Sequence, residues 1–433
     1  MQILFKHAMV LTMENDTILR DALVAVDGDK LAYVGPERVE WMDRPYDRIV
    51  DAAGCLIMPG MVNTHTHLAM TLLRGYGGGL PLKAWLEEKI WPVEERFQQE
   101  DYYVGTQMAV AEMLLTGTTC FLDMYMGMEQ TAEVLRETGM RGVLSRGMTA
   151  SSVKELEPKL AENVKLFEDW HGKENGRIQV FLGPHGEYTN TRDTLRACAE
   201  AARQLGCGLN IHVAETAGER AGCLERHGVS PVALLEQVGA LEGRAVAAHC
   251  VYVDENDIRI LAGHGVGVAH NPSSNMKLAS GFAPVSEMLA QGVRVGLGTD
   301  GTASNDRLDM LREANLASLL AKGHTGDPTR LNAFETLRMA TLGGAEALGL
   351  EERIGSLVAG KQADLVMLDV TGPGYQPQHE LINHLVYSSD SRDIKLTMVD
   401  GAVLMERGRL TTMDLHEVSR RFTDRARRLF DKA

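Results

Sequence analysis

The 433-residue sequence has few cysteines, no long apolar run and a deficit of positive charge. No apolar run approaches the ~20 residues that a membrane-spanning helix needs, and Met1–Lys6 lacks the layout of a signal peptide. The six cysteines are scattered and form no Cys-x-x-Cys pair, a pattern that fits reduced thiols better than a disulfide framework. We therefore expect a cytoplasmic protein with no membrane partner.

The deficit of positive charge also limits the partners. Lys and Arg total 44 against 59 Asp and Glu, which gives a formal net charge of −15. Such a chain is a poor general binder of nucleic acid, although a local pocket could still hold a nucleotide. Hydrophobic residues make up 44% and charged residues 24%, which is ordinary globular usage and excludes a disordered chain. We expect a small-molecule partner and no nucleic acid.

Both ends of the chain are rich in short β-type runs. Asp27 and Gly28 lie between two apolar runs, and an Asp-Gly pair in that setting predicts a hairpin. A similar pattern returns late in the chain. The simplest interpretation is one composite β-sandwich domain built from residues 1–57 plus 359–412, followed by a basic C-terminal helix over residues 413–433.

Between these ends, residues 58–358 alternate short apolar runs with segments of helical period, which is typical of parallel βα units. Eight such units predict an α/β fold of the (β/α)₈ TIM-barrel type, with functional groups at the C-terminal ends of the strands. A doubly wound sheet is the alternative, but it does not explain why polar residues close so many strands. The eight runs end near His67, Asp123, Arg146, His185, His212, His249, Asn271 and Asp300.

Three histidines and one aspartate at these strand ends form a candidate metal site. His65 and His67 are two residues apart on one strand, so their side chains point to the same side. His212 and Asp300 close two other strands. This set of nitrogen and oxygen ligands suits a divalent zinc or iron ion. We expect one ion, because the strand that ends at His185 has no lysine that a carbamate could use to bridge two metals.

Two further residues are candidates for acid–base chemistry. Glu215 lies three residues beyond His212, and His249 closes the next strand. A carboxylic acid or an unligated histidine beside a metal-activated water can move protons. Taken singly, His249 would more often be a hydrogen-bonded core histidine and Glu215 a surface residue. Their positions at the ends of adjacent strands favour a catalytic role for both.

These motifs carry a resemblance to known enzymes. The segment Pro59–His67, with His212, His249 and Asp300, resembles the amidohydrolase superfamily. A more specific similarity, to the methylthioadenosine/S-adenosylhomocysteine deaminases, extends over essentially the whole chain. It is carried by Trp91–Glu94, His212–Glu215, His270–Gly281, Gly298–Asn305 and Gly360–Leu365.

The resemblance implies hydrolytic deamination of an adenine nucleoside to its inosine analogue and ammonia. The substrates would be methylthioadenosine, S-adenosylhomocysteine or adenosine, the ion would be zinc, and we also expect a homo-oligomer. Glu215 would protonate N1 of the purine, Asp300 would carry the proton of the attacking water, and His249 would orient that water. The implied metal ligands are His65, His67, His212 and Asp300, and the implied substrate contacts are Trp85, Glu94, Arg146, His185, Glu215, Asp300 and Ser304.

The sequence departs from the family at the substrate's amino-acid end. Some members have a second arginine after the one that matches Arg146, and here only Lys154 stands nearby. A thioether nucleoside without a carboxylate is therefore the expected preference. The alternatives are a guanine or triazine hydrolase with the same metal site, and a non-catalytic nucleoside-binding barrel. Glu215 argues against a triazine dechlorinase, since chloride leaves without being protonated.

Overall fold

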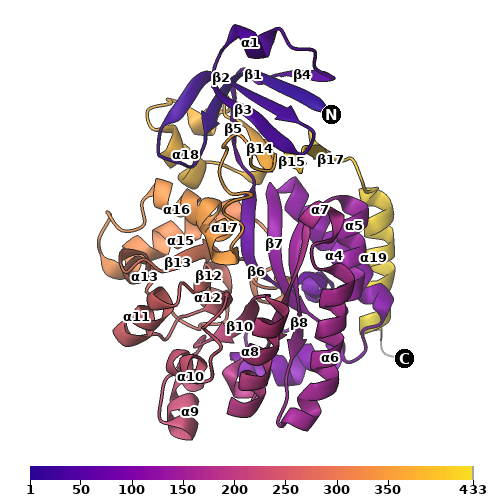
Figure 1. Ribbon diagram of the computed structural model, residues 1–433, viewed down its shortest axis with the longest axis vertical. Helices are drawn as coiled ribbons and strands as arrows, with labels where there is room; N and C mark the ends of the chain where they lie inside the picture. The colour runs from indigo at the N-terminus through magenta and orange to yellow at the C-terminus, as the bar shows by residue number, and fades with distance from the viewer. Residues whose placement is uncertain (432–433) are drawn as a thin grey trace.

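The computed structural model describes residues 1–431, and eight parallel strands form its central barrel (Figure 1). Each strand pairs with the next one in the sequence, which rules out the doubly wound alternative. The first and last strands approach each other, since the Thr64 hydroxyl donates to the carbonyl of Leu297 at 2.9 Å. The predicted (β/α)₈ fold is confirmed. Its strands are β6 (Met61–Thr66), β7 (Thr118–Tyr125), β8 (Arg141–Met148), β9 (Ile178–Pro184), β10 (Leu209–Val213), β11 (Ala245–His249), β12 (Gly267–His270) and β13 (Arg294–Leu297).

Helices surround the barrel, and several of them begin at a residue whose side chain caps the first turn. The Thr191 side chain accepts from the backbone N–H of Thr194 at the start of α8, and Gly206 ends that helix at φ 68°, as its sequence predicts. The surrounding helices are α4 (Gln99–Leu115), α5 (Met128–Thr138), α6 (Val153–Trp170), α8 (Arg192–Leu205), α9 (Ala217–His227), α10 (Pro231–Gln237), α11 (Glu255–Gly263), α13 (Val285–Ala290), α15 (Met310–Thr325), α16 (Ala333–Met339) and α17 (Leu342–Leu348).

A second sheet, mostly antiparallel, lies at one end of the barrel (Figure 1). It joins the two ends of the chain, because β5 pairs with β14. Phe5, Val24, Leu365 and Leu396 share one apolar core. The exact domain boundaries stay a prediction. The strands are β1 (Gln2–Leu11), β2 (Ile18–Asp27), β3 (Lys30–Pro36), β4 (Arg48–Asp51), β5 (Cys55–Pro59), β14 (Leu365–Asp369), β15 (Ile394–Val399), β16 (Ala402–Glu406) and β17 (Arg409–Leu410).

A buried ion-pair network connects the barrel to this sheet. Arg141, at the start of β8, donates from Nε to Asp364 at 2.8 Å and from Nη2 to the same carboxylate at 3.0 Å. It also donates to Asp400 in the turn between β15 and β16. Because Arg141 stands at the N-terminal end of β8, the sheet covers the end of the barrel opposite the expected site.

The C-terminal helix α19 (Leu415–Phe430) packs along α4 (Figure 1). Arg425 and Arg428 both donate to the buried carboxylate of Asp101. These arginines therefore fasten the helix to the barrel. The predicted helix extends to residue 433, and its last two residues lie outside the described part of the chain. Across residues 1–431, no helix combines the length and the apolar character needed to cross a membrane.

Candidate active site

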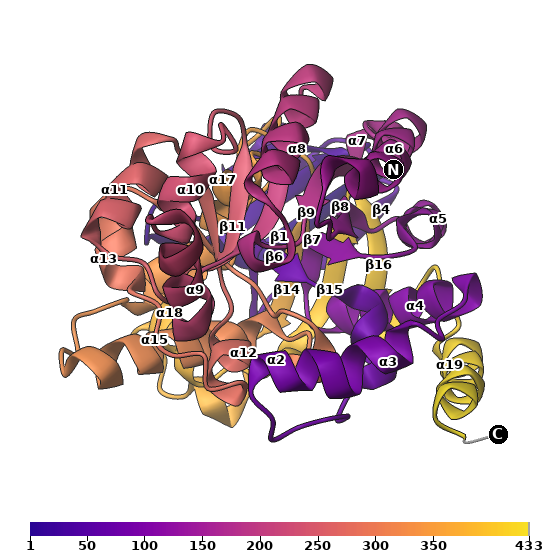
Figure 2. The same ribbon diagram turned by 90° about the horizontal axis from the view of Figure 1, so that it is seen from below.

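A cavity of about 940 Å³ opens at the C-terminal ends of the barrel strands. Figure 2 views this end, around which α2 (Leu82–Trp85), α3 (Trp91–Glu94), α9 and α12 (Pro272–Lys277) are arranged. All of the predicted site residues except the fully buried His65 line the cavity. They are His67, Trp85, Glu94, Arg146, His185, His212, Glu215, His249, Asp300 and Ser304.

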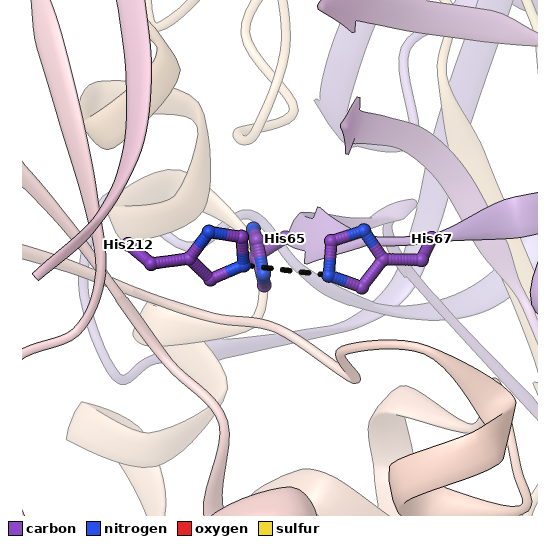
Figure 3. Close-up of side chains that lie close together, drawn as sticks. All are labelled: His65, His67 and His212. Atoms are coloured by element: carbon purple, nitrogen blue, oxygen red, sulfur yellow. Dashed lines mark hydrogen bonds between the residues drawn. The ribbon is translucent and has the colours of Figure 1, made fainter. Parts of the chain in front are cut away.

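The imidazoles of His65, His67 and His212 face one another (Figure 3). The Nδ1 of His67 donates to the carbonyl of Met124 at 2.5 Å, and the Nδ1 of His212 donates to the carbonyl of His185 at 2.6 Å. Both bonds leave the Nε2 atoms, with their lone pairs, turned toward the common centre. Such outer hydrogen bonds fix the tautomer and orientation of metal-binding histidines.

The spacing of the donor atoms fits a single ion. Ligands of a tetrahedral zinc ion, each about 2.1 Å from the metal, lie about 3.4 Å from one another. Here the Nε2 atoms of His67 and His212 are 3.4 Å apart. Asp300 Oδ1 lies 3.1 Å from His67 Nε2 and 3.4 Å from His65 Nε2. Both ring nitrogens of His65 are buried without a hydrogen bond, and an ion at this centre would give Nε2 a partner.

Asp300 is held from both sides. Its Oδ2 accepts hydrogen bonds from Ser274 at 2.6 Å and Ser304 at 2.8 Å, while Oδ1 faces the histidines. Burial alone would raise the pKa of this carboxyl, but the nearby imidazoles of His65 and His67 hold it well below its usual range. The backbone of Asp300 is left-handed, with φ 57°, which marks the strained geometry common at functional sites. The carboxylate is therefore ionised and fixed in orientation.

Glu215 and His249 form a second pair of ionisable groups. Glu215 Oε2 lies 3.7 Å from His249 Nε2, and Glu215 Oε1 accepts from Ser280 at 3.1 Å. The Nδ1 of His249 is 2.9 Å from the Asn275 side-chain oxygen, to which it donates. Burial raises the pKa of Glu215 above that of an ordinary carboxyl. This glutamate therefore holds its proton more tightly than an ordinary carboxyl does.

The cavity lining also includes the predicted base and ribose contacts. Trp85 is buried, and the carboxylate of Glu94 accepts a hydrogen bond from the Tyr125 hydroxyl. Burial raises the pKa of Glu94. His185 Nδ1 lies 3.1 Å from the Thr189 hydroxyl, and burial lowers the pKa of His185 to about 4, so its ring is neutral.

The cationic end of the cavity, where Arg146 and Lys159 lie, differs from the expectation. Lys154 is exposed and does not line the cavity, whereas Lys159 does. Lys159 Nζ lies 3.1 Å from Glu155 Oε1, and Arg146 is paired with Glu162. Both cations that reach this part of the cavity therefore already have an anionic partner.

Residues 56–404 match the amidohydrolase family. The chain belongs to that family. This amidohydrolase is 47% identical, over 99% of both chains, to a protein of Pelotomaculum thermopropionicum named 5-methylthioadenosine/S-adenosylhomocysteine deaminase. It is therefore a member of the deaminase family that its motifs indicated.

Two solved structures share the fold of this amidohydrolase. An adenosine deaminase from Xanthomonas campestris with bound zinc superposes with a TM-score of 0.93 at 36% identity, covering 98% of each chain. An atrazine chlorohydrolase from Arthrobacter aurescens, complexed with zinc, gives a TM-score of 0.90 at 26% identity over 98% of this chain and 100% of its own. The same scaffold therefore holds zinc in proteins named for different reactions.

Several site residues were not found by sequence reasoning. Ser274, Asn275 and Ser280 lie within the motif His270–Gly281, which the resemblance singled out, but nothing in their spacing indicated contacts to Asp300, His249 and Glu215. Lys159 had no signal of its own, because a lysine on an amphipathic helix is typical of a solvated face. These contacts depend on how the loops after the strands fold back.

Proposed function

We propose that this amidohydrolase removes the 6-amino group of adenine nucleosides by hydrolysis, giving the inosine analogue and ammonia. Methylthioadenosine and S-adenosylhomocysteine are the proposed substrates, with adenosine as a weaker one. The observation that carries the proposal is the convergence of Glu215, His249 and Asp300 on one side of a cavity large enough for a nucleoside. The 47% identity to a protein named as such a deaminase supports it.

The metal centre is the first requirement of this reaction. His65, His67, His212 and Asp300 would hold one zinc ion, and their donor spacing supports this ligand set. A bound zinc ion supplies a nucleophile at neutral pH by lowering the pKa of water toward about 7. Elemental analysis of the purified protein tests the proposal, and two ions per active chain would contradict it.

Side chains of the protein carry out the proton transfers. Glu215, whose pKa burial raises, donates its proton to N1 of the purine, so that negative charge does not accumulate on the ring. Asp300 accepts the proton of the attacking water and returns it to the departing ammonia. His249, oriented by Asn275, positions that water with its Nε2. General acid–base catalysis of this kind contributes about 10²–10⁴-fold in rate.

The remaining cavity residues would bind the nucleoside. Trp85 packs near the base, and Glu94 accepts hydrogen bonds from the ribose hydroxyls, which suits a carboxylate. His185 and Ser304 contact the bound substrate from the wall nearest the metal centre. Arg146 stands where a 5′ substituent would leave the ribose.

Substrate preference follows from the ion pairs at the cationic end. An S-adenosylhomocysteine carboxylate would have to compete with Glu162 for Arg146 and with Glu155 for Lys159. An exposed ion pair contributes about 0.2–1 kcal/mol, less than tenfold in affinity. We therefore expect kcat/KM for methylthioadenosine to equal or exceed that for S-adenosylhomocysteine. Arg146→Ala should reduce activity on S-adenosylhomocysteine more than on methylthioadenosine.

A panel assay tests the reaction itself. Methylthioadenosine, S-adenosylhomocysteine, adenosine, guanine and an aminotriazine are each incubated with the zinc-loaded protein, and ammonia release is measured beside the absorbance change from adenine to hypoxanthine. Faster turnover of guanine or the triazine would replace the proposed substrate. Absence of ammonia from every compound would favour a non-catalytic nucleoside-binding barrel.

We also propose a cytoplasmic homo-oligomer. Light scattering on the purified protein checks the oligomeric state, and a monomer at micromolar concentration would contradict it.

A further inference from the structure

A second glutamate stands directly behind the proposed proton donor. Glu219, in the first turn of α9, is buried, and both of its carboxylate oxygens accept backbone hydrogen bonds. The N–H of Ala214 donates to Oε1 at 2.8 Å, and the N–H of Glu215 donates to Oε2 at 2.7 Å. One side chain thus fixes two successive peptide groups, and the second belongs to Glu215 itself.

The segment that Glu219 holds is conformationally unusual. Ala214 has a left-handed backbone with φ 48°, a region that residues with a β-carbon rarely adopt. This bend turns the chain after His212 so that Glu215 faces the cavity. Strained backbone persists only where the surroundings over-determine it, and here two hydrogen bonds to one carboxylate do so.

Ordinary helix capping does not account for this geometry. In a capping box, the third helical residue accepts from the N–H of the cap residue itself. Asp257 does this for Asp254 at the start of α11, with a distance of 3.1 Å. Glu219 occupies the same position in α9, whose cap residue is Thr216. Its carboxylate instead reaches past Thr216 to the two residues before it.

We infer that Glu219 is a positioning residue for the deamination, which clamps the Ala214–Glu215 peptides so that the Glu215 carboxyl points at the purine ring. The inference rests on the proposed function of Glu215 as proton donor. Glu219 itself does not touch the cavity. Its removal should therefore reduce the chemical step and leave nucleoside affinity and zinc content unchanged.

The test compares Glu219→Gln and Glu219→Ala with the wild-type holoenzyme. A glutamine keeps one acceptor oxygen, so it should retain more activity than alanine. Loss of an outer partner typically costs 10–100-fold, and we expect a fall in kcat of about that size for Glu219→Gln with KM within about twofold. The matched control is Asp257→Asn, since Asp257 is a buried carboxylate at the same helical position and anchors the same helix α9 through Arg220. It should keep the wild-type kcat.

A double-mutant cycle separates positioning from general destabilisation. If Glu219 acts through Glu215, Glu215→Gln combined with Glu219→Gln should have about the kcat of Glu215→Gln alone, because residues that act as a unit are non-additive. If the double variant instead loses kcat by the product of the two single-variant losses, the inference is overturned. An equal loss of kcat in Asp257→Asn would also overturn it.

A measurement without substrate keeps the inference separate from the proposed reaction. Hydrogen exchange of the Ala214 and Glu215 amides should be slow in wild type and faster in Glu219→Gln, while exchange of the amides within α9 stays unchanged. Unaltered exchange at these two amides would overturn the clamp. Absence of deamination by the wild type would instead overturn the proposed function and leave the exchange result standing.

Discussion

Buried polar and charged side chains lie at both ends of the barrel strands, but their pairing differs between the two. We call the N-terminal ends, beside the sheet, the base of the barrel, and the C-terminal ends, where the cavity opens, its mouth. At the base, the guanidinium of Arg141 is paired with Asp364 and Asp400, in geometry that uses three of its N–H groups. At the mouth, the His65 ring has no hydrogen bond at all, and Asp300 takes a left-handed backbone. The chain thus pairs a buried guanidinium with carboxylates where the sheet joins the barrel, and it leaves both nitrogens of a buried imidazole without a hydrogen bond where the cavity opens.

The difference shows what each end is for. A buried cation paired with carboxylates belongs to the structure of the joint, because removing one partner leaves an uncompensated charge. Polar groups left without partners at the ends of several strands cost folding free energy, and such groups persist where a ligand or an ion completes them. A substitution at the base should therefore lower stability, whereas a substitution at the mouth should lower metal binding or the reaction rate.

The largest effect is expected at the metal site. His212→Ala should remove bound zinc and reduce deamination to background, since water without the ion keeps a pKa of about 15.7. Metal analysis beside the ammonia assay checks both. His264→Ala is the control, because this histidine lies outside the cavity and faces Glu236. Retention of zinc and turnover by His212→Ala would contradict the ligand set.

The second-largest effect is expected at Glu215, the proposed proton donor. Glu215→Gln should keep the wild-type zinc content and lose about 10²–10⁴-fold in kcat, because the amide cannot protonate the ring. Single-turnover kinetics measures the loss at the chemical step. Near-normal turnover would show that the proton reaches the purine by another route.

At the base, a substitution should lower the free energy of unfolding by an amount comparable to the loss at the proton donor, and it should leave the reaction rate unchanged. Arg141→Met leaves the buried carboxylate of Asp364 without a cation, so the free energy of unfolding should fall by about 3–5 kcal/mol, while kcat per folded molecule stays at the wild-type value. Denaturant unfolding and active-site titration measure the two. Arg203→Met removes an exposed pair with Glu242 and should change stability by less than about 1 kcal/mol. A drop in kcat for Arg141→Met would mean that the two ends are coupled.

The smallest effect concerns Glu313, a buried carboxylate without a cation. Burial raises its pKa to about 7, although Ser273 and Asn305 donate hydrogen bonds to it. The unfolded chain ionises this group near pH 4.3, so the native state binds more protons between that pH and about 7, and stability falls as the pH rises through this interval. Glu313→Gln should flatten that decline when Tm is followed from pH 5 to 8. If the curves of Tm against pH for the wild type and for Glu313→Gln run parallel, the raised pKa of Glu313 is excluded.

The sequence predicts much of this arrangement because its periodicities are local. The strand runs, the His65–His67 spacing and the Thr191 cap each depend on a few consecutive residues, and all are found in the structure. The strand ends of a barrel then bring His212 and Asp300 to the same place. Fold and proposed ligands could thus be predicted together.

The features that could not be predicted depend on the direction in which a side chain points, or on contacts between residues that are far apart in the sequence. Lys154 and Lys159 are five residues apart on α6, which at 100° per residue turns them to different faces, and only the second reaches the cavity. Arg141 and Asp364 are 223 residues apart, with no local pattern to connect them. The reach of the Glu219 carboxylate past Thr216 depends on a bend that the sequence does not signal.

The pairing of β5 with β14 has a consequence for how the protein is made. Pro59 in β5 is opposite Leu365 in β14, so roughly 300 residues leave the ribosome between the two partners. At about 5–20 residues per second, this separation corresponds to about 15–60 s. During that time one edge of the apolar strand β5 has no partner, and an open strand edge is a template for aggregation. Slow translation at low temperature prolongs this exposure, whereas a circular permutant that begins near residue 359 would synthesise the sheet as one continuous segment.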